Sequence, residues 1–177
     1  MKYKLTDETM TTESGIVLHR IECVTAFSDV KVGKKGGWIE KEENLSQCDN
    51  CWVYGNAMVY GNAFVGGNAC VCENSCVREN ARVCENACVC GNSCVRENAF
   101  VCGNAVIKND GDYIVFKNNW SSGRYFTWTR SNDRWSVGCF YGTGKELIEK
   151  AYKDSKLSGD CYKAYVELVE KLKEIQK

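Results

Sequence analysis

The sequence contains no proline and only one histidine among its 177 residues. Without proline, the tight turns must come from residues that tolerate a positive φ, and the chain is rich in glycine and asparagine. With His19 as its only histidine, the chain has no metal site of two histidines. It also lacks a second imidazole to act as a general base near neutral pH.

The chain also lacks an excess of either charge and a long apolar run. Lysine plus arginine number 23 and aspartate plus glutamate number 23, so we expect neither a nucleic acid polymer nor a membrane surface as partner. Nowhere do eighteen apolar residues follow one another, and the opening MKYKLTDETM has no secretory segment. We therefore expect a cytoplasmic protein, in which thirteen cysteines do not form a disulfide framework.

From residue 52 the sequence repeats every six residues, from WVYGNA and MVYGNA through CVCENS and CVRENA to VIKNDG. Each hexad has a branched aliphatic residue. In all but the last hexad, an Asn follows three positions later and an Ala or Ser comes directly after that Asn. Because side chains alternate across a strand, the aliphatic residue points inward and its two neighbours point outward. We expect the Asn to take the left-handed corner conformation. Three hexads then form one triangular coil, and coils stack as a solenoid.

These hexads resemble the left-handed parallel β-helix of hexapeptide acyltransferases, with the small residue matched at Ala57, Ala63 and Ala69. Residues 3–105, with GGWIE, NLSQ and CWVYGNA, resemble the start of the YdcK-like group of acyltransferase-related proteins in bacteria and phages. That resemblance implies an irregular first coil beginning at Ile39 and Leu45. The predicted fold is mainly β, with an N-terminal β cap and irregular coil over 1–51. About three coils of left-handed parallel β-helix over 52–110 and a small C-terminal module over 111–177 complete it.

The C-terminal residues have a different pattern. DYIVFK, RYFTWTR and RWSVGCFY predict three strands, and Thr143 with Glu146 forms a capping box at the start of a helix. A second helix is expected after Asp160, which gives a β-β-β-α-α module. The strands are rich in aromatic residues, and one interpretation is that their aromatic face docks on the open end of the solenoid.

The same module is also the candidate ligand site. Trp120, Arg124, Trp128 and Arg130 combine stacking surfaces with guanidinium groups. Thr143, Gly144 and Lys145 open a helix whose N-terminus favours an anion. A nucleotide has both a base to stack and phosphates to bind, so we expect a small anionic, nucleotide-like ligand at these residues. The alternative is that the module is only a cap.

The cysteines of the repeat are expected in stacked pairs, because eighteen residues complete one coil. A flat outer face is a poor tetrahedral cage, so we predict no metal site and no cofactor and interpret the thiols as tolerated surface or interface positions. The pair Cys48 and Cys51 is interpreted as structural. The stacked pairs are Cys70 with Cys88, Cys72 with Cys90, Cys76 with Cys94, and Cys84 with Cys102.

Three functions compete. The first is a non-catalytic binding protein, trimeric as the resemblance implies, that captures the nucleotide-like ligand; the resemblance to phage proteins suggests sequestration of a defence signal. The second is a structural or protein-interaction scaffold that uses the outward side chains. The third is a divergent acyltransferase, which would need His19 as its base beside a neighbouring subunit. The repeat itself has no histidine, so we predict no enzyme and assign no catalytic residue.

Overall fold

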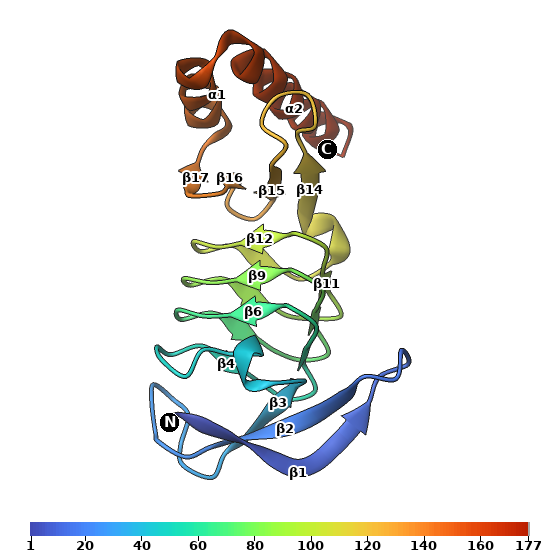
Figure 1. Ribbon diagram of the computed structural model, residues 1–177, viewed down its shortest axis with the longest axis vertical. Helices are drawn as coiled ribbons and strands as arrows, with labels where there is room; N and C mark the ends of the chain where they lie inside the picture. Colours follow the sequence, from blue (N-terminus) through green and yellow to red (C-terminus); the bar gives the residue numbers. More distant parts are fainter. Residues whose placement is uncertain (177) are drawn as a thin grey trace.

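The computed structural model describes residues 1–176 and shows a parallel β-helix between an N-terminal sheet and a C-terminal module (Figure 1). The N-terminal part holds β1 (Tyr3–Thr11), β2 (Val17–Cys23), β3 (Lys35–Ile39) and the short helix η1 (Glu42–Asn44). The β-helix consists of two-residue strands, namely β4 (Trp52–Val53), β5 (Met58–Val59), β6 (Phe64–Val65), β7 (Cys70–Val71), β8 (Cys76–Val77), β9 (Arg82–Val83), β10 (Cys88–Val89), β11 (Cys94–Val95), β12 (Phe100–Val101) and β13 (Val106–Ile107). The module holds η2 (Asp110–Asp112), β14 (Tyr113–Lys117), β15 (Tyr125–Thr129), β16 (Arg134–Val137), β17 (Phe140–Gly142), α1 (Gly144–Asp154) and α2 (Lys156–Ile175).

The strands of the β-helix stack in three columns with the expected period. The columns are β13-β10-β7-β4, β12-β9-β6, and β11-β8-β5, the last of which continues into β3, β2 and β1. Residues eighteen apart pair in parallel, as Cys88 with Cys70 and Val89 with Val71. The column β13-β10-β7-β4 has four strands, and Ile39 and Leu45 of the irregular first coil add a fourth level to the other two columns, so the β-helix has about four turns, slightly more than the three expected.

The interior of the β-helix is the predicted row of aliphatic residues. The valines from Val53 to Val101 and Ile107 have no exposed surface, while the alanines after the corners are also buried. Each fully buried valine contributes about 1.5 to 2 kcal/mol of hydrophobic stabilisation. The inward direction of the aliphatic residues is therefore confirmed.

The corners differ from the prediction. The residue in the left-handed conformation is the one before each Asn, a Gly or a Glu with φ near 60°, as at Gly55, Glu73 and Glu97. The Asn side chains instead hydrogen-bond to one another from coil to coil, for example Asn50 Nδ2 to Asn68 Oδ1 at 3.1 Å. Each Asn was expected in this conformation because its short amide tolerates positive φ. In the structure the Asn stands one position after the left-handed residue, where its side chain joins the ladder of amides.

Three glutamates at corners have a compensating bond to the next coil. The Glu73 carboxylate accepts the Gly91 N–H at 2.8 Å, and Glu79 accepts the Glu97 N–H at 2.9 Å. Glu85 accepts the Gly103 N–H at 2.8 Å. A left-handed conformation costs a residue with a side chain about 1 to 2 kcal/mol, and a charge-assisted hydrogen bond offsets a cost of that size.

The N-terminal cap has the predicted β structure. β1 and β2 form an antiparallel hairpin, β2 pairs antiparallel with β3, and β3 pairs parallel with β5. The two glycines of GGWIE allow β3 to approach the first coil. A Cβ on Gly36 would lie 2.6 Å from the Val53 carbonyl oxygen, and one on Gly37 would lie 2.5 Å from that of Ala57.

The C-terminal module has four strands where three were predicted. The third predicted strand is divided into β16 and β17 because Gly138 takes a positive φ of 57° and turns the chain. The second helix begins at Lys156 rather than after Asp160, since Ser155 acts as its N-cap and its Oγ accepts the Ser158 N–H. The capping box of Thr143 and Glu146 on α1 is confirmed.

The two faces of the module's sheet are reversed relative to the expectation. Its aromatic face, with Phe126, Trp128 and Trp135, packs under α1 and α2. Its other face carries Thr127, Thr129 and Ser136, which are buried toward the β-helix. Aromatic docking on the β-helix was thus wrong, because an open end of a solenoid presents N–H groups that need acceptors.

Those N–H groups are indeed bonded to side-chain oxygens. Phe100 N donates to Thr127 Oγ1 at 2.9 Å, and Val106 N donates to Ser131 Oγ at 2.7 Å. Three further donors of the last coil are matched in the same way, namely Cys94 N to Asp110, Arg96 N to Tyr113, and Lys108 N to Asp112. The C-terminal module therefore provides acceptors for the backbone N–H groups at the end of the β-helix.

Substitution of Glu97 by glycine is expected to stabilise the protein. Glu97 has a φ of 62°, and its carboxylate makes no hydrogen bond among the described residues, so Glu97→Gly relieves the strain without losing a contact. After allowance for the added flexibility of the unfolded chain, we expect a gain of up to about 1 kcal/mol in the free energy of unfolding. Glu79→Gly is the matched control, because it loses the bond to Glu97 N and should not gain. Urea denaturation measures both, and an equal loss of stability in the two variants would contradict this account of the corners.

Candidate functional site

A pocket in the C-terminal module lies between the loop after β14, the end of β16, β17 and the two helices. Its volume is about 270 Å³. Arg124 and Lys150 bring positive charge to it, and Asp154 is the carboxylate in its lining. The complete lining is Ser121, Ser122, Arg124, Val137, Phe140, Leu147, Lys150, Ala151, Asp154, Ser155, Ser158 and Tyr162.

The walls of this pocket are held in place by hydrogen bonds. Ser122 Oγ lies 2.9 Å from the Tyr162 hydroxyl, which joins the loop to α2. Ser155 and Ser158 stand at the N-terminus of α2, where helix N–H groups favour negative charge. The aromatic ring of Phe140 adds an apolar wall. The arrangement suits a ligand with an anionic group and a flat apolar part.

Only one of the seven predicted ligand residues lines this pocket, and it is Arg124. Trp120 lies on the loop before β15 with 77% of its surface exposed. Trp128 is 2% exposed, and its indole N–H donates to Asp133 Oδ1 at 2.8 Å, so its ring packs in the module core. The guanidinium of Arg130 bonds to Gln176 near the end of α2.

The predicted anion site at the start of α1 is filled by the protein itself. The Glu146 carboxylate accepts the N–H of Thr143 at 2.7 Å and its hydroxyl at 2.8 Å, and these bonds lower the pKa of Glu146. A Cβ on Gly144 would lie 2.7 Å from Val166 Cγ1, so this glycine allows the two helices to pack closely. Lys145 points to solvent, with its Nζ 3.9 Å from Glu149.

Sequence reasoning missed Lys150, Ser155 and Ser158. Ser155 was detectable, since Ser followed three positions later by another polar residue in KDSKLS marks a helix start. Lys150 was not detectable, because its position depends on how α1 packs against α2.

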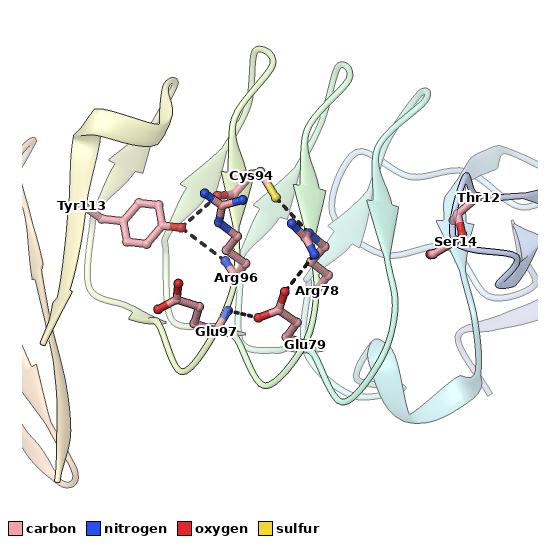
Figure 2. Close-up of polar contacts among 8 residues, drawn as sticks. All are labelled: Thr12, Ser14, Arg78, Glu79, Cys94, Arg96, Glu97 and Tyr113. Carbon is pink, nitrogen blue, oxygen red and sulfur yellow. Dashed lines mark hydrogen bonds and ion pairs between the residues drawn. The ribbon is translucent and has the colours of Figure 1, made fainter. Parts of the chain in front are cut away.

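A second hollow lies on the β-helix face built by β5, β8 and β11. Its volume is about 540 Å³, and the tip of the β1–β2 hairpin forms one side of it. Figure 2 shows Arg78 and Arg96 on successive coils of this face, with Cys94 beside Arg78 and Tyr113 of β14 beside Arg96. Arg78 also bonds to Glu79 at 2.8 Å, so much of its charge is already paired.

The thiol of Cys94 on this face has an altered acidity. Cys76 is its partner in the parallel ladder and donates a hydrogen bond to it, while Arg78 Nε lies 3.3 Å from its Sγ. These contacts lower the pKa of Cys94 to about 6. The stacking of Cys76 with Cys94 and of Cys70 with Cys88 is confirmed by the strand register.

Comparison with known proteins gives a partial match. No protein-family model matches this chain. A stretch of 60 residues is 37% identical to the Uncharacterized acetyltransferase YdcK of Escherichia coli (strain K12). The fold and the match fit a hexapeptide-repeat, acetyltransferase-like protein. The matched stretch is 30% of this chain and spans only 18% of the length of YdcK.

The histidine that acyl transfer would need lies in the N-terminal sheet. His19 is on β2, where it pairs with Thr9 and Ile39, and its Nδ1 is 3.3 Å from the Thr6 carbonyl oxygen. Its ring is thus held against the hairpin backbone. Among residues 1–176, no helix has the length and apolar character needed to span a bilayer.

Replacement of Arg78 is expected to slow alkylation of Cys94. In the wild type, the rate of reaction with iodoacetamide should rise through pH 6 and level off above it, because the thiolate is the nucleophile. Arg78→Gln removes a hydrogen bond and a positive charge, so the pKa of Cys94 rises and the rate at pH 7 falls roughly fivefold. Arg82→Gln is the control, since Arg82 stacks on Phe64 on another face. Tandem mass spectrometry locates the label, and equal rates in both variants would refute the assignment.

Proposed function

We propose that the protein is a non-catalytic, oligomeric binding protein that captures a small anionic, nucleotide-like ligand in the pocket of its C-terminal module. One observation carries the proposal, namely that Arg124 and Lys150 line the same pocket as the hydroxyls at the start of α2 and the ring of Phe140. The β-helix then acts as the rigid support on which this module is mounted.

The chemistry of the lining supports this ligand class. Two cationic side chains against one carboxylate leave the pocket with a net positive charge, and a phosphate binds well to a guanidinium that offers parallel N–H donors. Val137, Leu147 and Phe140 supply the apolar surface that a base needs. A volume of about 270 Å³ lies near the lower end of small-molecule sites, so a mononucleotide-sized group fits better than a dinucleotide.

The biological purpose that we propose is sequestration of a nucleotide defence signal. Its support is the resemblance of the N-terminal part to phage proteins of the YdcK-like group. Capture without turnover requires a pocket but no general base, which agrees with a single histidine held in the N-terminal sheet.

Acyl transfer is the second candidate, and the similarity to an acetyltransferase favours it. The hollow beside Cys94 would be the place for the acyl donor, since Arg78 lines it and Arg96 lies on the next coil of the same face. A scaffold that binds another protein through the outward side chains is the remaining alternative.

Calorimetric titration tests the pocket. We expect heat with at least one member of a panel of AMP, cyclic AMP, small cyclic dinucleotides and ADP-ribose. Arg124→Ala and Lys150→Ala should each weaken the affinity about tenfold or more, because each removes a charge-assisted contact. Lys145→Ala is the matched control, since this lysine lies on the same helix but points to solvent.

The possible results separate the candidates. An equal loss in the Lys145→Ala variant would place the anion at the start of α1 and refute the pocket. Heat with acetyl-coenzyme A alone would favour acyl transfer, and the absence of heat with every compound would favour the scaffold.

The oligomeric part of the proposal has its own measurement. The resemblance to hexapeptide acyltransferases predicts a trimer, so sedimentation equilibrium should give three times the chain mass of 19.9 kDa. A monomeric mass at micromolar concentration would overturn the trimer and leave the pocket proposal intact, because the pocket is built by one chain.

A further inference from the structure

One outer face of the β-helix brings three thiols together. The Sγ atoms of Cys70, Cys72 and Cys88 all lie within 4.8 Å of one another. Each of the three side chains is half-buried, so the cluster is open to solvent on one side. The thiol of Cys90, which follows Val89 on the same face, contacts Cys88 but is farther than 4.8 Å from at least one of the other two.

The backbone of the β-helix sets these positions. Cys70 and Cys72 flank the inward Val71, so both side chains point outward. Cys88 pairs directly with Cys70 in the next coil. Cys70 N donates to the Ala87 carbonyl at 2.9 Å and Cys72 N to the Val89 carbonyl at 2.9 Å, which fixes the two coils relative to each other. The three thiols are therefore arranged before any ligand arrives.

We propose that Cys70, Cys72 and Cys88 form a three-coordinate site for a soft monovalent metal ion, Cu(I). Soft thiolate ligands select Cu(I) and zinc over hard cations such as Mg²⁺ and Ca²⁺. With metal–sulfur bonds of about 2.3 Å, a planar three-coordinate ion needs sulfur atoms about 4.0 Å apart. This distance is compatible with the three Sγ atoms, all of which lie within 4.8 Å of one another. Each thiol that binds releases one proton, and the copper stays Cu(I).

The flat face decides the coordination number. A tetrahedral zinc ion requires a fourth ligand from above the plane of the three sulfurs, and the regular coils place no inserted loop over this face. The absence of such a fourth ligand disfavours a tetrahedral ion on this face. An ion that lies in the plane of the three sulfurs needs no ligand from above that plane.

The other thiol ladders serve as internal comparisons. Cys76 and Cys94 form a pair whose flanking outward positions are Arg78 and Arg96, in CVR rather than CVC. Cys84 is flanked across Val83 by Arg82. In both ladders an arginine occupies the position of the third thiol, and its positive charge opposes a cation. Only the face with Cys70 combines a vertical pair with a lateral third sulfur among the described residues.

The test is an anaerobic titration of the reduced full-length protein with Cu(I), supplied as its acetonitrile complex, against the chelator bicinchoninate. We expect the wild type to retain one equivalent of Cu(I) at a chelator concentration that removes copper from sites with only two thiols. Cys72→Ser and Cys88→Ser should weaken this binding on the order of a hundredfold. Cys84→Ser is the matched control, because Cys84 is also half-buried and follows an inward valine.

A spectroscopic measurement identifies the ligands. X-ray absorption of the protein with one equivalent of copper should show three sulfur neighbours at a single distance. Circular dichroism checks that each serine variant is folded. Equal retention of copper in the Cys72→Ser and Cys84→Ser variants would overturn the proposal, as would two sulfur neighbours. A Cys70–Cys88 disulfide in protein isolated anaerobically from cells would overturn it as well.

Discussion

The hydrogen bonds between successive coils of the β-helix determine the rest of the structure. Each coil donates backbone N–H groups to the carbonyl groups of the next, as in Cys70 N to Ala87 and Cys88 N to Ala105. This direction is the same along the whole stack, so the last coil is left with donors that face no further coil. The requirement for acceptors at that end explains the position and the orientation of the C-terminal module. Thr127 and Ser131 meet it directly.

The location of the candidate pocket follows from that requirement. Because residues alternate across a strand, a face of Thr127, Thr129 and Ser136 turned to the β-helix places the aromatic residues on the opposite face. That aromatic face needs a cover, and α1 and α2 provide it. The pocket lies where the edge of this cover meets the loop that carries Arg124, so one module can both cap the β-helix and hold the candidate pocket.

The regular part of the fold could be predicted from the sequence, and the parts set by tertiary contacts could not. The valine at every sixth position is buried as expected, because burial depends only on the strand period. The left-handed corner was assigned to Asn on its intrinsic tolerance, yet it falls on residues such as Glu73, whose carboxylate is bonded to the next coil. Trp128 was taken for a stacking surface, but its burial depends on helices whose packing the strand pattern does not determine. Arg124 was predicted from its place among the tryptophans and arginines of the module, and of the seven predicted residues it is the one that lines the pocket.

The same stacking makes the outward side chains a set of vertical ladders, and the residue beside each thiol pair decides its chemistry. A near-exact duplication of eighteen residues places each cysteine over its copy, which explains the pairs without any selection for function. Duplication by itself does not determine which residue lies beside each thiol pair, on the other side of the inward valine. Where that neighbour is Arg78, the thiol of Cys94 is stabilised as a thiolate by a fixed positive charge. Where it is Cys72, a third sulfur stands in the place of the charge. One repeat unit therefore provides two distinct sulfur environments on one rigid frame, and a single side chain separates them.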